Sequence, residues 1–296
     1  MRSTLYETRR ARRAAGSRLL RRETGLLTKV ILYAVLVTFT VMTLCPLFWL
    51  VISSFKTTQA FQMDRLGLPE RWNLDNYPQA WRIGKFGTLI LNSILYTSTS
   101  TLATILLSAS AGFAFAKLRS RWTPLLHGSF VIGILLTIQS IMVPLFLAAN
   151  LANLYNTRLG VFIVYTGISL PIGVYLFTAY IRGLPDAVVE SARIDGAGYL
   201  TIFRRIILPM TRPVATTLAI LNITATWNEF MLINILVSRD ALKSLPVGIL
   251  RFSGALSSDY GKQFAALVIG LLPMVVFYLI FRHQITKGVP AGAVKG

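Results

Sequence analysis

One acidic residue lies inside a long apolar stretch of the sequence, and it is the first candidate for chemistry. Glu229 stands in the stretch 213–237, directly after Trp227 and Asn228. A charge in an apolar membrane segment is costly, so it needs a partner, water or a function. A ring, an amide and a carboxylate are also the groups that recognise a sugar, because rings cover its C–H patches and polar groups bond its hydroxyls. The alternatives are a helix-packing hydrogen bond or a salt bridge to a partner subunit.

Three further polar residues lie in apolar stretches. Asn92 and Ser93 are adjacent in the stretch 86–116, and Gln139 lies in the stretch 122–157. Each is a weaker candidate for a polar pathway, because hydrogen bonding between packed helices explains such residues equally well.

The residues that enzymes and metal sites need do not gather in the sequence. His127 and His283 are far apart and have no acid or cysteine at ligand spacing, and Cys45 is the single cysteine. A phosphate-binding loop needs G-x4-G-K-[ST]. The nearest match, at Gly261 and Lys262, lacks the first glycine and the final hydroxyl residue. We therefore expect no catalytic residue, no metal and no bound cofactor, and any ATP must be bound by another polypeptide.

The composition indicates a membrane protein, in which the polar candidates lie on membrane-spanning helices. Of 296 residues, 54% are hydrophobic and 14% charged, and the mean hydropathy is +0.61, which a soluble chain does not show. A spanning helix needs about 20 apolar residues. Stretches of that length between charged residues predict an all-α protein with six transmembrane helices, at 30–55, 86–116, 122–157, 159–181, 213–237 and 263–281.

The positive charges predict the orientation of these helices. The segments on the side of the termini hold twenty Lys and Arg residues and the alternate segments hold ten, so we expect cytosolic N and C termini. We expect the arginine-rich arm 1–29 to set this topology and to contact anionic lipid. Although the net charge is +19, we expect no nucleic-acid partner, because the charges flank apolar stretches.

Five regions follow from this pattern. They are the cytosolic arm 1–29, the first transmembrane helix 30–55, an extracytoplasmic loop 56–85, a core of five helices at 86–281, and a cytosolic tail 282–296.

The largest cytosolic segment within the core is the loop 182–205. Its sequence predicts a short helix of about ten residues from Asp186, a left-handed stop at Gly196, and a second helix from Tyr199 towards Pro209. Glu190 and Arg193 share a polar face with Asp186. On periodicity alone, a plain connector with a solvated face explains this segment.

The spacing in this loop resembles a known motif. Glu190-Ser191-Ala192, then Gly196 and the run 206–209 resemble the EAA motif, E-A-A-x3-G-x9-I-x-L-P, of ABC importer permease subunits, with Ser191 replacing an alanine. The phrases ARIDGA and WNEF, the Asn-Ser pair at 92–93 and the ending GVPAGAVKG are similar to the sugar-importer branch, in particular the maltose-type six-span permease. The resemblance covers nearly all of the chain after about residue 25.

The resemblance implies the ABC type-I importer transmembrane fold and a role as half of a sugar pathway. It implies that the short helix docks on a cytosolic ATPase, with the coupling residues Glu190, Ser191, Ala192, Arg193, Asp195 and Gly196. The implied partners are a homologous second permease, a cytosolic ATPase dimer that uses ATP, an extracytoplasmic solute-binding protein, a mono- or oligosaccharide, and membrane lipid. The predicted pathway residues are Asn92, Gln139, Trp227, Asn228 and Glu229.

Two alternatives stay open. The chain is a permease for a non-sugar solute, or it is an ion-coupled secondary carrier in which Glu229 is the proton site.

Overall fold

The computed structural model describes residues 26–118, 120–249 and 259–288, so most of the predicted arm and part of the predicted tail lie outside the described residues. Helices and their connections account for these ranges, and they contain no strand, which confirms the all-α prediction. The chain divides into two compact units, residues 1–52 and 53–296.

The first unit is described through α2 (Leu26–Ser53), an apolar helix of 28 residues. At about 1.5 Å per residue it is about 42 Å long, which exceeds the ~30 Å hydrocarbon core. The helix begins four residues before the first predicted span and ends two residues before its end.

The second unit contains three long apolar helices, each able to cross a membrane by length and composition. They are α5 (Phe86–Lys117), α8 (Arg158–Arg182) and α15 (Tyr260–Gly288). Their bounds agree with the second, fourth and sixth predicted spans to within a few residues, except that α15 extends further at its C-terminal end.

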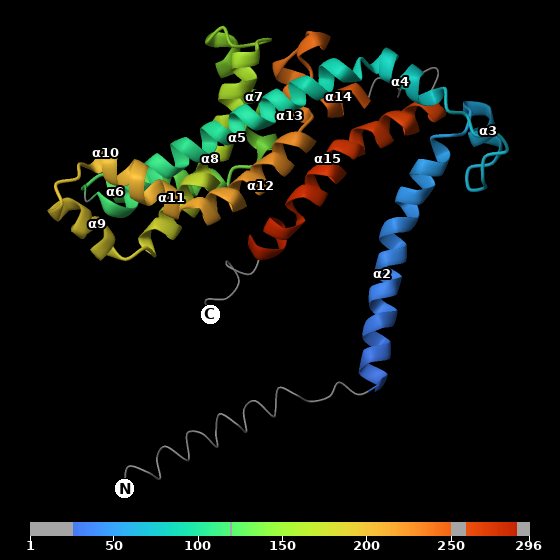
Figure 1. Cartoon of the computed structure of the whole chain (residues 1–296). Coiled ribbons are helices and arrows are strands. Elements are labelled where there is room, and N and C mark those ends of the chain that lie inside the picture. The colour runs from blue at the N-terminus through green and yellow to red at the C-terminus, as the bar shows by residue number, and fades with distance from the viewer. Residues whose placement is uncertain (1–25, 119, 250–258, 289–296) are drawn as a thin grey trace. The chain divides into compact units, whose positions relative to one another are not determined.

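The most extensive packing in the second unit is between α5 and α8 (Figure 1). Small residues permit it. A Cβ added to Gly112 would lie 2.7 Å from the Cβ of Phe177, and one added to Gly173 would lie 2.2 Å from the Ser108 hydroxyl. Close backbone approach of this kind is how helices associate in lipid, where the hydrophobic effect does not drive them together.

The third predicted span is not one straight helix. Residues 122–157 form α6 (Thr123–Ile134) and α7 (Ile138–Leu151), which meet at 111°. Thr137 has extended backbone, and its hydroxyl accepts a hydrogen bond from the Ser140 N–H, so α7 begins as a newly capped helix.

The fifth predicted span is also divided. The chain before it forms α10 (Tyr199–Ile202), a π-helical turn η1 (Phe203–Ile207) and α11 (Leu208–Met210), and a 70° bend leads into α12 (Arg212–Asn228). The chain breaks again at 229–230 before α13 (Met231–Leu236). The second unit thus holds two bent helix pairs, and the count of six spans stays a prediction that treats each pair as one span.

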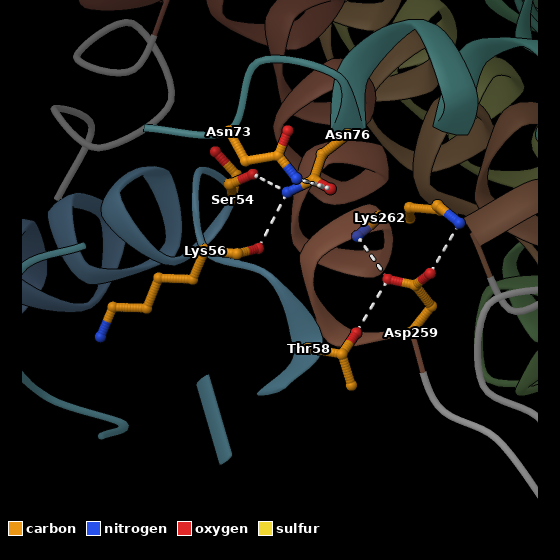
Figure 2. Close-up of polar contacts among 7 residues, drawn as sticks. All are labelled: Ser54, Lys56, Thr58, Asn73, Asn76, Asp259 and Lys262. Carbon is orange, nitrogen blue, oxygen red and sulfur yellow. Dashed lines mark hydrogen bonds and ion pairs between the residues drawn. The ribbon is translucent and has the colours of Figure 1, made fainter. Parts of the chain in front are cut away.

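The loop 56–85 contains α3 (Thr58–Met63) and α4 (Asn76–Gly84), and the segment before α15 contains η2 (Asp240–Leu242) and α14 (Leu245–Ile249). Asn76 holds the first of these loops in place. Its amide donates to the carbonyls of Ser54 and Lys56 at 2.8 and 2.9 Å (Figure 2).

The start of α15 is fixed to the same loop. Thr58 donates to one Asp259 carboxylate oxygen at 3.0 Å, and Lys262 pairs with the other at 2.7 Å (Figure 2). Gly261 lets the backbones approach, because an added Cβ would lie 2.3 Å from the Lys56 carbonyl oxygen. We call these contacts of Asn76 and Asp259 the loop–α15 junction.

Candidate functional site

The short helix of the predicted coupling loop forms where the sequence places it. α9 runs from Asp186 to Ile194, after Pro185 and with the Asp186 carboxylate in its first turn. Gly196 ends it with φ +81°, a conformation that costs other residues energy. Lys117, the last residue of α5, donates to the Leu184 carbonyl at 2.9 Å and pairs with Asp186 at 2.5 Å, so the loop is tied to α5.

One face of α9 packs against the helices of the core. Val189 and Ala192 are buried, in a cluster that contains Phe177 and Ile181 of α8 and Ile202 of α10. Ala192 therefore helps to fix α9 against the core, and its predicted part in coupling stays a prediction.

The opposite face of α9 is open. Glu190, Ser191, Arg193, Asp195 and Gly196 are all exposed. These five predicted coupling residues form one surface beside the buried face, and Arg193 lies over the Tyr199 ring at 5.5 Å. The geometry supports a surface that is open to a partner and is not a self-contained polar site.

Two apolar residues on this surface escaped the sequence reading. Ile194 is 85% exposed and Leu200 is 63% exposed. Ile194 follows Ala192 by two residues, which places it roughly 200° around the helix, opposite the buried face. That angular position was the signal available in the sequence. We define the coupling surface as Glu190, Arg193, Ile194, Asp195 and Leu200.

The second site, around Glu229, is built at the break between α12 and α13. One carboxylate oxygen accepts the Leu232 N–H at 2.6 Å, and the other accepts the Ile233 N–H at 3.1 Å and the Tyr165 hydroxyl at 2.7 Å. Glu229 thus caps α13 and joins it to α8. This geometry supports the packing alternative.

The two residues before Glu229 differ in their surroundings. Trp227 is buried with Phe86, Leu245 and Ile269, so its ring faces are covered by the chain's own side chains. Asn228 is exposed, and its amide donates to the Thr224 carbonyl one turn earlier. The structure does not bring the three residues together as one polar cluster.

The Asn-Ser pair of α5 also makes structural contacts. Asn92 donates to the carbonyls of Ala241 and Lys243 at 2.8 and 3.0 Å, and Ser93 accepts the Leu245 N–H at 2.8 Å. Both residues hold the segment 241–245 against α5. Gln139, in contrast, is exposed in the first turn of α7.

A buried amide that the sequence reading missed joins three helices. Asn222 of α12 donates to the Thr101 hydroxyl of α5 at 2.9 Å and accepts from the Ser169 hydroxyl of α8 at 2.6 Å. It is 5% exposed. The sequence could have indicated Asn222, because it is a polar residue in the apolar stretch 213–237, which is the reason that Glu229 was chosen as a candidate. We call these three residues the Asn222 lock.

Within the part of the chain that the structure describes, no group of three or more His, Cys, Asp or Glu side chains has an arrangement that could hold a metal ion. The two sites offer a partner-facing surface and buried hydrogen bonds between helices. Neither brings an activated nucleophile to an acid–base pair.

Known proteins match nearly the whole chain. The family described as "Binding-protein-dependent transport system inner membrane component" matches residues 14–287. The multiple sugar-binding transport system permease protein MsmG of Streptococcus mutans is 33% identical over 267 residues, 89% of this chain and 96% of that protein. The diacetylchitobiose uptake system permease protein NgcG of Streptomyces coelicolor is 30% identical over 265 residues, 89% of this chain and 88% of that protein.

A solved structure shares the fold. It is a chain of a bacterial ABC transporter involved in the import of the acidic polysaccharide alginate. The TM-score is 0.79 at 19% sequence identity, over 88% of this chain and 97% of that one. This match confirms the predicted importer transmembrane fold.

Proposed function

The chain belongs to the family of binding-protein-dependent transport system inner membrane components, and from this membership we propose that it forms half of the transmembrane pathway of an ATP-driven sugar importer. As a member of this family it is a multi-pass protein of the inner membrane and a permease subunit, not an enzyme. The proposal concerns the solute, the partners and the residues that couple it to ATP.

The observation that carries the coupling proposal is the two-faced helix α9. Its inner face is fixed by Val189 and Ala192 in the core, and its outer face presents Ile194 at 85% exposure. In the proposed complex, Ile194 is the apolar anchor that a pocket of the partner buries, and its charged neighbours form the rim. We assign the coupling surface to a cleft of a cytosolic ATPase dimer, in which Glu190 pairs with a basic group.

The contacts of α9 suggest how movement would pass into the membrane. α9 follows α8 directly and leads through α10 into α12, while Lys117 ties the same loop to α5. The Asn222 lock joins α5, α8 and α12 at a second place, through hydrogen bonds between their side chains. Closure of the ATPase would therefore move α5, α8 and α12 together, and would shift the population between inward- and outward-open states.

The solute and the remaining partners are proposed from the relatives. MsmG is named for multiple sugars and NgcG for diacetylchitobiose, so we propose a mono- or oligosaccharide as the solute. The family name implies a solute-binding protein, and we assign its contact to the outer loops 56–85 and 239–262. A homologous second permease would complete the pathway, and ATP would be bound by the ATPase alone.

We retain the five predicted pathway residues but divide their roles. Gln139 and Asn228 are exposed and are proposed to face the solute. Asn92, Trp227 and Glu229 are proposed to act by positioning the helices that line the path, since their side chains are engaged within the chain.

A secondary carrier with Glu229 as its proton site is the weaker candidate. Three donors hold this carboxylate as a cap of α13 and a contact to α8, whereas a proton site has to give up such bonds in each transport cycle. A carrier would transport without ATP and without partners. A permease for a non-sugar solute would need the same partners, and only the uptake assay separates it from the sugar proposal.

Co-purification tests the coupling proposal. The chain is isolated in mild detergent from cells of its source, as wild type and as Glu190→Lys, and the accompanying proteins are identified by mass spectrometry. We expect a second permease and an ATPase with the wild type, and loss of the ATPase alone from the variant. Glu70→Lys is the matched control, because Glu70 is an exposed acid of the loop 56–85. Equal ATPase recovery from both variants would contradict the docking role.

A further inference from the structure

An open hollow of about 400 Å³ lies between the end of α5 and the start of α6. Its size falls within the range of about 300–1,000 Å³ that is common for small-molecule sites. The residues that line it combine apolar walls, two hydroxyls and one cation: Phe115, Ala116, Leu118, Ser120, Arg121, Thr123 and Pro124. The hollow lies beside the coupling loop, because Lys117 reaches that loop directly.

The charge around the hollow is positive. Arg121 lies over the Trp122 ring at 5.2 Å, and no carboxylate of the described residues forms an ion pair with it. Phe115 contacts the His127 ring edge-on at 5.8 Å, and Arg182 acts electrostatically on that imidazole from the end of α8.

The neighbouring acid does not offset this charge. Asp186 is paired with Lys117, so both groups are already engaged. Arg121 and Arg182 remain as cations whose charge the described carboxylates leave unbalanced. An anion is the ligand that complements them.

The apolar part of the site points to a lipid. Trp122 is 54% exposed beside Arg121, and Leu125 on the first turn of α6 is 65% exposed. A Trp next to an Arg at the end of an apolar helix is typical of the membrane–water interface. Basic pockets between membrane helices on the cytosolic side are known to hold anionic headgroups.

We propose that this hollow binds the phosphate-bearing headgroup of an anionic phospholipid of the inner leaflet. Arg121 contacts the phosphate, Ser120 and Thr123 bond the glycerol or phosphate oxygens, and the acyl chains run along Phe115 and the exposed side of α6. The inference rests on the proposed function only for its orientation, which places the coupling loop and this hollow at the cytosolic side. Bound lipid here would brace the turn between α5 and α6 beside the coupling loop.

The test measures lipid retained by the full chain, together with any subunits that co-purify. Wild type, Arg121→Gln and Arg239→Gln are reconstituted in nanodiscs that contain equal amounts of phosphatidylglycerol and phosphatidylcholine, then extracted and weighed by native mass spectrometry. Arg239 is the matched control, because it is an exposed arginine in the segment after α13. We expect phosphatidylglycerol retention to fall about fivefold in Arg121→Gln, which corresponds to about 1 kcal/mol per basic residue near the surface. Arg239→Gln should retain as much as wild type.

Further arms separate the sources of phosphate. Inorganic phosphate added before extraction should not displace the lipid, and Arg121→Lys should restore part of the retention because the positive charge remains. Displacement by inorganic phosphate, equal retention by wild type and Arg121→Gln, or equal retention of phosphatidylcholine would each overturn the lipid site. Lipid retention is measured without ATP and does not depend on the ATPase. If the chain binds the lipid but recruits no ATPase, the proposed function is contradicted and the lipid site is still supported.

Discussion

The Tyr165 hydroxyl of α8 donates a 2.7 Å hydrogen bond to the Glu229 carboxylate, which at the same time caps α13. The break after α12 is therefore fixed to a helix that leads directly into the coupling loop. Tyr165 is buried, so loss of this contact leaves its hydroxyl without a partner.

Replacing Glu229 should damage transport while leaving the partners in place. Glu229→Ala removes a helix cap, a loss of about 1 kcal/mol, and also the bond to α8. Glu229→Gln keeps one acceptor oxygen and should be milder. We expect sugar uptake in proteoliposomes with all partners to fall in the order wild type, Gln, Ala, with unchanged ATPase recovery.

Tyr165→Phe is the matched variant for this contact, because it removes only the hydroxyl. If Glu229 acts through α8, Tyr165→Phe and Glu229→Gln should reduce uptake by similar factors, and the double variant should add little. If both single variants, Glu229→Gln and Tyr165→Phe, take up sugar at the wild-type rate, the contact is dispensable. Ion-driven uptake by the chain alone, lost in Glu229→Gln, would favour the carrier.

The Asn222 lock should matter for coupling more than for folding. Asn222→Ala removes two interhelical hydrogen bonds, each worth about 0.6 kcal/mol on average in a membrane. We expect a small drop in thermal stability, but a large drop in the ATP hydrolysis that the loaded binding protein stimulates. The measurement compares stimulated with basal hydrolysis in the reconstituted complex.

The control for this prediction is Thr224→Ala, which removes a hydroxyl bonded only within its own helix. Its stimulation ratio should stay at the wild-type value. If Asn222→Ala also keeps that ratio, α5, α8 and α12 do not depend on the amide to move together.

Much of the fold followed from the spacing of charges and apolar stretches. The helices α5, α8 and α15 agree with predicted spans because charged residues such as Lys85 and Arg182 mark their ends. The 111° bend could not be read in this way, since it lies inside the apolar stretch 122–157, and the 70° bend at Thr211 precedes the predicted span 213–237. They depend on local caps and tertiary contacts, which composition does not record.

The candidate sites were predictable in part for a similar reason. Gly196 and the start of α9 at Asp186 follow from rules of helix ends. The role of Glu229 was left open, because the sequence cannot tell that Tyr165 lies opposite it. Asn222 was missed although its polarity in an apolar stretch was visible, and its two partners are distant in sequence.

Gly196 should be needed for the shape of the coupling loop. At φ +81° an alanine costs about 1 kcal/mol, although the structure leaves open space for its Cβ. We expect Gly196→Ala to lower the affinity for the ATPase about fivefold through a displaced α9, measured by titration of the purified ATPase. Gly198→Ala is the control, because Gly198 has extended backbone at φ −70° and open space. Equal affinities of the two variants would contradict a conformational role for Gly196.

Ile194 should contribute more to the ATPase contact than its charged neighbours. Its exposed side chain would be fully buried by a partner, and a buried apolar anchor of this size is worth about 1.5–3 kcal/mol. Ile194→Asp should therefore abolish ATPase co-purification, whereas Ile194→Leu should keep it. Unchanged recovery of the ATPase with Ile194→Asp would show that Ile194 is not the anchor, and Leu200 would be the next candidate.

The loop–α15 junction should depend on pH only in strong acid. Burial raises the pKa of Asp259, but hydrogen bonds from Lys262 and Thr58 and the charge of Lys262 outweigh it and lower the pKa below the ordinary 3.8. A carboxylate with a lowered folded pKa stabilises the protein fully above its unfolded value, and this contribution is lost as the pH falls through the folded value. We expect the melting temperature of wild type to exceed that of Asp259→Asn by a constant amount above about pH 4, and the difference to shrink below it.

Asp240→Asn, which removes the charge from a longer pair of 3.5 Å whose carboxylate is 56% exposed, should change the melting temperature less. A difference between wild type and Asp259→Asn that persists at pH values well below 3.8 would mean that the charge of Asp259 does not hold the junction.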